Sequence, residues 1–282
     1  MKPPPFDYYA PGTLDEALTL LDELGEDAKP LAGGQSLVPL MNFRLAWPSA
    51  LVDLNFVAGL DHIRRDGEEL VFGATARQAD AERSDDVRPG WPLLIEALRH
   101  VGHPATRSRG TVAGSLAHAD PAAELPAVLI ALRGEVVVAS RRGSRRIAAD
   151  DLFLGFLSTA LEPGELITEV RIPAPPPGSG WAFVEHARRF GDFALAGVAV
   201  SIAPGGAGIA LCGAAGRPLR AARAEQALEG GAAPDDVGRV AAEECEPQSD
   251  IHGDAAYRRD LVRVLTSRAV RTAQGRVAEA HG

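Results

Sequence analysis

Residues 109–121 read RGTVAGSLAHADP, a run of small residues that decides how the rest of the chain is interpreted. Hydroxyl groups stand at Thr111 and Ser115, and Asp120 before Pro121 favours the start of a helix. Small residues let a backbone approach an anion closely, and N–H groups beside a helix start favour a phosphate. Taken alone, a buried crossover of small residues would explain this stretch equally well.

A second glycine-rich loop, AGGQS at residues 32–36, lies between an expected strand at 29–31 and an expected helix at 37–45. It matches neither the GxGxxG fingerprint nor a Walker motif, because no Gly-Lys-Ser/Thr follows. Considered by itself, this loop is also explained by a tight structural turn. Two such loops in one chain favour a dinucleotide, whose pyrophosphate needs donors from both sides. A Cβ atom at Gly33 or Gly34 is expected to fill the space that the pyrophosphate needs.

The remaining pattern predicts a mixed α+β protein. A helix begins at a capping box formed by Thr13 and Glu16, and Gly25 ends it. Further helices are expected over residues 91–101, 121–132 and from about 254 to the C-terminus, strands over 50–54, 165–172, 181–187, 194–202 and 208–212, and hairpins that turn near Gly67 and Gly143. The Pro- and Gly-rich residues 173–180 read as a linker.

Composition excludes several classes of function. A net charge of −9 argues against a nucleic-acid partner, and no apolar run approaches the roughly 18 residues that a membrane span needs. The N-terminus has no apolar signal region, so we expect a cytoplasmic protein. Cys212 and Cys245 are too few for an iron–sulfur cluster, and we expect no metal site. Redox chemistry would therefore need an organic cofactor.

Two other features have alternative interpretations. His118 lacks an obvious partner beyond Asp120, and we interpret it as structural or as a neighbour of the cofactor rather than as a catalytic base. Asp120 is expected to cap the following helix. The run Arg141–Arg146 is interpreted as a solvated hairpin turn, with a docking surface as the alternative.

The chain closely resembles the FAD-binding medium subunits of the xanthine dehydrogenase and carbon monoxide dehydrogenase family of molybdenum hydroxylases. Four stretches carry the resemblance in the family's order and spacing: LAGGQSLVPLMNFRLAWP at 31–48, RGTVAGSLAHADPAAELP at 109–126, RRFGDFALAGVAVSI at 188–202 and SDIHGDAAYRRDLVRVLTSRA at 249–269. Together they extend over essentially the whole chain, and none of them is a generic glycine-rich loop.

The resemblance implies an α+β fold with a PCMH-type (vanillyl-alcohol-oxidase-like) FAD-binding domain over residues 1–175. That domain would divide into subdomains of about 1–57 and 58–175, and a smaller C-terminal flavoprotein domain would occupy 176–282. FAD is the implied cofactor. The implied binding residues are Lys29, Pro30, Leu31, Ala32, Gly33, Gly34, Gln35, Ser36, Val101, Thr111, Val112, Ala113, Gly114, Ser115, Glu124, Leu166 and Ile167. The two loops would hold the pyrophosphate, and Leu166 and Ile167 would lie near the isoalloxazine.

The second loop departs from the family pattern. The family loop usually reads Thr-Ile-Gly-Gly-Asn, whereas this chain has Ala113 for the first glycine and Ser115 for the asparagine. If the backbone at residue 113 needed a positive φ, alanine there would cost roughly 1 kcal/mol.

The resemblance also implies partners. Substrate would be hydroxylated on a large molybdopterin-containing subunit, and electrons would cross a small two-iron two-sulfur subunit to this FAD and leave for an external acceptor. The complex would be a dimer of heterotrimers, and this chain would contribute no catalytic acid or base. The alternatives are a self-contained FAD oxidoreductase on the same fold and a flavin-free scaffold.

Overall fold

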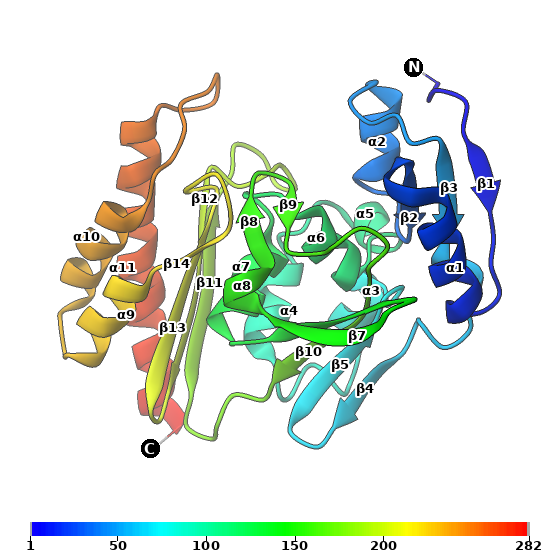
Figure 1. Cartoon of the computed structure of the whole chain (residues 1–282). Coiled ribbons are helices and arrows are strands. Elements are labelled where there is room, and N and C mark those ends of the chain that lie inside the picture. The colour runs from blue at the N-terminus through cyan, green and yellow to red at the C-terminus, as the bar shows by residue number, and fades with distance from the viewer. Residues whose placement is uncertain (1, 281–282) are drawn as a thin grey trace.

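Three large sheets and the helices between them organise the molecule in the computed structural model, which describes residues 2–280 (Figure 1). The predicted mixture of helices and strands in a two-domain α+β architecture is confirmed. The predicted limits after residues 57 and 175 fall between β3 and β4 and between β10 and β11, and as domain limits they stay predictions.

The N-terminal lobe is a parallel three-stranded sheet in the order β1-β3-β2, with two helices. Its elements are β1 (Asp7–Tyr9), α1 (Leu14–Leu24), β2 (Ala28–Leu31), α2 (Leu37–Asn42) and β3 (Ala50–Asp53). The capping box of Thr13 and Glu16 is present, and Gly25 ends α1 with φ 68°. Because the strands are parallel, the residues that follow β2 and β3 emerge at the same edge of the sheet.

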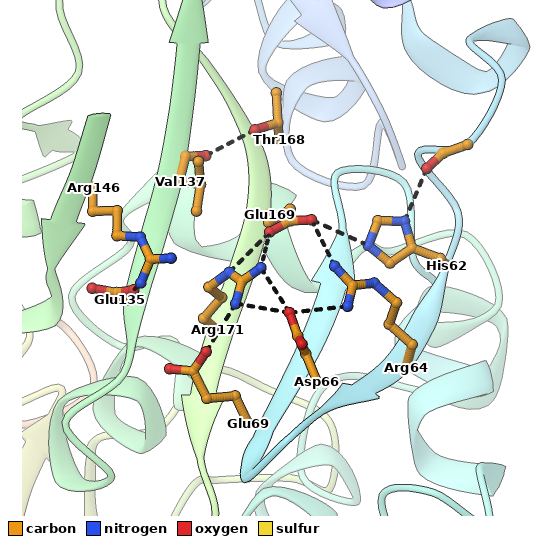
Figure 2. A network of polar contacts seen from close by, with 11 residues as sticks. His62, Arg64, Asp66, Glu69, Glu135, Val137, Arg146, Thr168, Glu169 and Arg171 are labelled. Carbon is orange, nitrogen blue, oxygen red and sulfur yellow. Dashed lines mark hydrogen bonds and ion pairs between the residues drawn. The ribbon is translucent and has the colours of Figure 1, made fainter. Parts of the chain in front are cut away.

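An antiparallel five-stranded sheet follows, in the order β4-β5-β10-β6-β7. Its strands are β4 (Ile63–Asp66), β5 (Glu69–Gly73), β6 (Glu135–Ser140), β7 (Gly143–Ala148) and β10 (Leu166–Pro173). Both predicted hairpins are confirmed. Connected to this sheet are α3 (Gln78–Arg83), α4 (Pro92–Leu98), α5 (Pro104–Arg107), α6 (Val112–His118), α7 (Glu124–Ala131), α8 (Ala149–Leu152) and the hairpin of β8 (Phe153–Gly155) and β9 (Ser158–Thr159). Figure 2 shows an ion-pair network of this sheet, in which Arg171 joins Asp66, Glu69 and Glu169.

The C-terminal part is an antiparallel four-stranded sheet covered by helices on its outer face (Figure 1). Its elements are β11 (Gly180–His186), β12 (Ala196–Ala203), β13 (Gly206–Cys212), β14 (Leu219–Arg220), α9 (Ala222–Glu229), α10 (Pro234–Glu244) and α11 (Ala255–Ala280). On the inner face, β11 contacts α4, and β12 and β13 contact α7. Every residue of α7 is buried, as expected for a helix enclosed between two sheets.

The structure differs from the sequence prediction around the second loop. Residues 112–118 are a short helix, α6, rather than a loop, because Thr111 caps it: the Thr111 hydroxyl oxygen accepts a hydrogen bond from the Gly114 N–H at 3.0 Å. The helix expected from Pro121 begins three residues later, at Glu124. The helix expected over 37–45 ends at Asn42, and Arg44 adopts φ 61°.

Within residues 2–280, no helix combines the length and the apolar character that a membrane crossing requires.

Candidate functional site

A cavity of about 510 Å³ lies between the N-terminal lobe and the helices of the five-stranded sheet. Every predicted cofactor-binding residue except Val112 lines it: Lys29, Pro30, Leu31, Ala32, Gly33, Gly34, Gln35, Ser36, Val101, Thr111, Ala113, Gly114, Ser115, Glu124, Leu166 and Ile167. The fold thus brings both glycine-rich loops to one cavity. Its volume is within the usual range for ligand pockets.

The first loop leaves β2 at its carboxyl end and presents unpaired backbone donors. Gly34 adopts φ 72°, which favours glycine, and Gln35 folds its side-chain amide back onto the Gly33 carbonyl oxygen at 3.3 Å. The backbone N–H groups of residues 33–36 have no acceptor within the described part of the chain. Unpaired N–H groups in a wall of a cavity are suited to an anionic ligand.

The second loop adds further donors to the same cavity. The N–H groups of Thr111 and Ala113 have no acceptor among residues 2–280. Val112 faces away: its side chain is 2% exposed, and its N–H donates to the Ala76 carbonyl oxygen at 3.1 Å. Ala113 lies inside α6 and is not among the residues with positive φ. The expected strain from alanine at this position is therefore absent.

A polar bridge that the sequence did not reveal joins the two loops. The Asn55 side-chain amide donates to the Ala32 carbonyl oxygen at 3.0 Å, and Arg77 donates both to the Asn55 side chain and to the Arg109 carbonyl oxygen. Gly33 lies against the same Arg109 carbonyl oxygen. The position of Asn55, directly after the expected strand at 50–54, is a sequence signal that could have indicated it. Nothing in the local sequence indicated Arg77.

Apolar residues also line the cavity. They include Val101, Leu166 and Ile167. Leu166 and Ile167 are neighbours in β10 and pair regularly with Ala139 and Val138, so their side chains face opposite sides of the strand. Leu166 packs in the core of the N-terminal lobe and Ile167 in the core of the five-stranded sheet, so the cavity borders both cores.

Glu124 is the most perturbed acid at the cavity. Burial, and then the charges of Glu185 and Asp120, raise the pKa of Glu124 to about 8. Glu124 as a whole residue is 6% exposed. Because its pKa is about 8, the carboxyl group is predominantly protonated at neutral pH. Burial also lowers the pKa of His118, an effect that Asp120 opposes. Asp120 accepts from the Ala122 N–H at 2.8 Å, just before α7, close to its predicted capping role.

The chemistry of the lining fits a dinucleotide cofactor. Backbone N–H groups from both loops can hold phosphates, and Lys29, which precedes the first loop in the chain, adds a cation to the lining. Gln78 lines the cavity, and its side-chain oxygen is buried without a hydrogen-bond partner among the described residues.

The basic hairpin is neutralised within the chain. Arg141, Arg142, Arg145 and Arg146 pair with Asp15, Glu162, Glu165 and Glu135, respectively. The Arg145–Glu165 contact also fixes a carboxylate that lines the cavity. These pairs favour the interpretation of this hairpin as a solvated turn over that of a basic docking surface.

The two cysteines are buried and unpaired, and burial raises the pKa of both thiols. The described part of the chain contains no group of three or more His, Cys, Asp or Glu side chains that could hold a metal ion.

Comparison with known proteins agrees with this geometry. Residues 4–175 match the family model for the FAD binding domain in molybdopterin dehydrogenase, and residues 181–273 match that for the CO dehydrogenase flavoprotein C-terminal domain. The first match confirms FAD as the predicted cofactor.

Individual relatives match over nearly their whole length. The 6-hydroxypseudooxynicotine dehydrogenase complex subunit alpha of Paenarthrobacter nicotinovorans is 41% identical, with 96% of this chain and 95% of the relative covered. The carbon monoxide dehydrogenase medium chain of Hydrogenophaga pseudoflava is 39% identical, with 99% and 100% covered.

A solved carbon monoxide dehydrogenase from Hydrogenophaga pseudoflava, lacking the Mo-pyranopterin moiety of its molybdenum cofactor, superimposes with a TM-score of 0.94. The identity is 40%, and 98% of this chain and 99% of the solved chain are covered. The resemblance inferred from the sequence is confirmed: this chain belongs to the family of FAD-binding medium subunits of molybdenum-dependent dehydrogenases.

Proposed function

We propose that this chain holds one FAD non-covalently between its two glycine-rich loops and works as an electron-transfer subunit. It accepts electrons from iron–sulfur clusters of a small partner subunit and passes them to an external acceptor. The observation that carries the proposal is the pair of adjoining loops whose unpaired N–H groups line one cavity.

The chain's own residues bind and orient the cofactor. The N–H groups of residues 33–36, Thr111 and Ala113 would hold the pyrophosphate, and Val101, Leu166 and Ile167 would lie against the isoalloxazine. Bound FAD supplies a carrier that exchanges electrons singly or in pairs. Arg77 and Asn55 keep the two loops at a fixed separation through their hydrogen bonds.

The proposed partners are a large molybdopterin-containing subunit and a small two-iron two-sulfur subunit, in a cytoplasmic dimer of heterotrimers. Exposed apolar side chains support docking beside the cavity. They lie on the segment that follows α2, on β8 and its connection to β9, and on the segment that leads into β12, which share the upper side of the molecule in Figure 1. These side chains are Phe43, Leu45, Trp47, Leu154, Phe156, Phe190 and Phe193.

The cofactor part of the proposal is tested on the purified chain. We expect one FAD per chain by absorbance near 450 nm, and acid precipitation should release all of the colour. Colour that stays in the pellet would contradict non-covalent binding and would direct attention to His118, a histidine in the cavity lining. A chain that stays colourless after FAD is added would contradict the proposal and favour a scaffold.

The electron-transfer part is tested by co-expression with candidate large and small subunits. We expect one complex on size exclusion that contains molybdenum and iron and is reduced by its organic substrate. The isolated chain should bind FAD and turn over no organic substrate. Turnover by the isolated chain would favour a self-contained oxidoreductase, and a chain that stays monomeric in the presence of both partners would contradict the assembly.

A further inference from the structure

A buried acid stands next to the polar bridge that joins the two glycine-rich loops. Asp53 is the last residue of β3 and is 7% exposed. Acidic side chains are rarely buried unless they are paired. Asp53 is not among the residues that line the cavity, so contact with a ligand does not explain its burial.

Three hydrogen bonds converge on the Asp53 carboxyl group. Its Oδ1 accepts from the backbone N–H of Asn55 at 3.0 Å and from the Asn55 side-chain amide. Its Oδ2 accepts from the Tyr8 hydroxyl at 2.6 Å. This hydrogen bond raises the pKa of Tyr8, so the hydroxyl keeps its proton and stays a donor. Because Tyr8 belongs to β1, the carboxyl group connects the first strand of the chain to Asn55.

These contacts decide which way the Asn55 side chain points. A side-chain amide carries two donors on its nitrogen and an acceptor on its oxygen. The acceptors Asp53 Oδ1 and the Ala32 carbonyl oxygen both take the nitrogen, so the oxygen is left for Arg77. If the amide turned around, its N–H groups would face a guanidinium that has only donors, and the bridge would open.

Arg77 completes the connection to the second loop. Its guanidinium donates to the Arg109 carbonyl oxygen, and its backbone pairs with Thr111 in an isolated antiparallel bridge. A continuous series of hydrogen bonds therefore runs from the first strand to both loops. Its members are Tyr8, Asp53, Asn55, Arg77 and the carbonyl oxygen of Arg109.

A simpler role for Asp53 is to cap the 3₁₀ turn Leu54–Phe56, because its side chain accepts from the Asn55 N–H. A cap needs one acceptor oxygen, and serine serves there as well as aspartate. Capping accounts neither for the hydrogen bond to the Asn55 side chain nor for the one from Tyr8. These two contacts favour a role in orienting Asn55.

We propose that Asp53 and Tyr8 are positioning residues for the pyrophosphate of FAD. They fix the Asn55 amide, and through Asn55 and Arg77 they hold the two loops at the separation that binds the cofactor. This inference rests on the proposed function. The N–H groups of residues 33–36, Thr111 and Ala113 have no acceptors within the described part of the chain, so the spacing of these donors depends on the contacts that hold the loops.

The test titrates variants of the full chain, freed of cofactor, with FAD and separately with ADP, which carries a pyrophosphate without a flavin. D53S can still cap the turn, but its single, shorter-reaching oxygen cannot also hold the Asn55 amide and the Tyr8 hydroxyl. We expect D53S to raise the Kd for both ligands at least about tenfold. Y8F, which removes one donor, should raise both roughly threefold.

D53N is the conservative variant that should restore most of the affinity. Its amide oxygen can keep both hydrogen bonds from Asn55, and its NH₂ group can donate to the Tyr8 oxygen. A role that depended on a buried negative charge, rather than on the orientation of Asn55, would make D53N as weak as D53S.

A double-mutant cycle shows whether Asp53 acts through Arg77. R77M already removes the hydrogen bonds that follow Asn55 in the series. D53S combined with R77M should therefore bind FAD no more weakly than R77M alone. A merely structural loss at Asp53 would instead add to the loss caused by R77M.

Two matched controls are available. Glu225 is also a buried acid, with a side chain 4% exposed that pairs with Arg133 away from the cavity lining. E225Q should lower the melting temperature without changing the Kd for FAD. Tyr9 neighbours Tyr8 in β1, and its hydroxyl makes no hydrogen bond within residues 2–280. Y9F should leave both affinities unchanged.

The outcomes separate this inference from the proposed function. Wild-type affinity in D53S and Y8F, additive losses in the cycle, or a loss for FAD without a loss for ADP would each overturn the positioning role and leave FAD binding in place. If D53S does not fold, Y8F and its combination with R77M decide, because Tyr8 is 52% exposed and phenylalanine keeps its ring. A wild-type chain that takes up no FAD would overturn both.

Discussion

Gly33 lies directly against the carbonyl oxygen of Arg109, so that the two glycine-rich loops touch each other as well as the cavity. A Cβ atom on Gly33 would overlap that oxygen and would come within 2.9 Å of the Gly110 Cα. We expected such a Cβ to fill the pyrophosphate space. The structure instead shows that it would collide with the backbone of the other loop. Gly33 is therefore needed to let the loops approach.

Replacement of Gly33 by alanine should separate the loops and weaken FAD binding. Backbone atoms form the obstacle, so the loop must shift, at a cost of about 2 kcal/mol, or roughly 30-fold in the Kd for FAD. Titration with FAD measures the Kd. Gly216→Ala is the control, because a Cβ there meets nothing within 4 Å. Unchanged affinity in Gly33→Ala would show that the loops need not touch.

Replacement of Arg77 by methionine should also weaken FAD binding. It removes both hydrogen bonds that connect Asn55 to the Arg109 carbonyl oxygen. Arg77→Lys should not restore affinity, because an ammonium lacks the planar fork that bridges two fixed acceptors. We expect at least roughly tenfold weaker binding in both variants. The control is Arg83→Met, an exposed position on α3; an equal loss there would point to α3 rather than to the bridge.

Gly34 should tolerate asparagine far better than valine. Its φ of 72° lies in the left-handed region, where asparagine is several-fold enriched and a β-branched residue is strained. The strain in valine should cost about 1–2 kcal/mol. Isothermal titration of the two variants with FAD compares them directly. Equal affinities would mean that this backbone conformation is not needed for binding.

Glu124 should make the cofactor-free chain less stable as pH rises. The folded-state pKa of about 8 exceeds the ordinary value of 4.5, so the carboxyl group is neutral in both states at low pH and no stability is lost there. Between these two values the unfolded state ionises while the folded state stays protonated, and stability falls by up to about 1.4 kcal/mol per pH unit.

Urea unfolding of the wild type and of E124Q as a function of pH measures this effect. E124Q should gain roughly 2–4 kcal/mol over the wild type by about pH 8 and nothing near pH 4. E165Q should behave in the opposite sense, because the hydrogen bond from Arg145 lowers the pKa of Glu165. Its loss of stability should be present at neutral pH and should shrink as pH falls. A pH-independent difference between E124Q and the wild type would contradict the buried acid.

Local patterns predicted much of the fold. The capping box at Thr13 and the hairpin turns depend on a few neighbouring residues, and they appear where the sequence placed them. The second loop was less predictable. Its small residues were compatible with a loop or with a helix. The N-terminal cap by the Thr111 side chain stabilises the helix, α6. The side chain of Val112 turned into the core for the same reason, since one face of a helix must be buried.

The sequence by itself determined the family, the cofactor and the two loops, because each is encoded in a contiguous stretch. Tertiary structure alone decided what joins these stretches. Arg77 bridges the loops, Gly33 meets Arg109, and Glu185 of β11 pairs with His100. These contacts join residues from separate elements, and their partners are set by strand register and helix packing rather than by periodicity along the chain. A single sequence carries no local signal for such pairs, so only the folded chain reveals them.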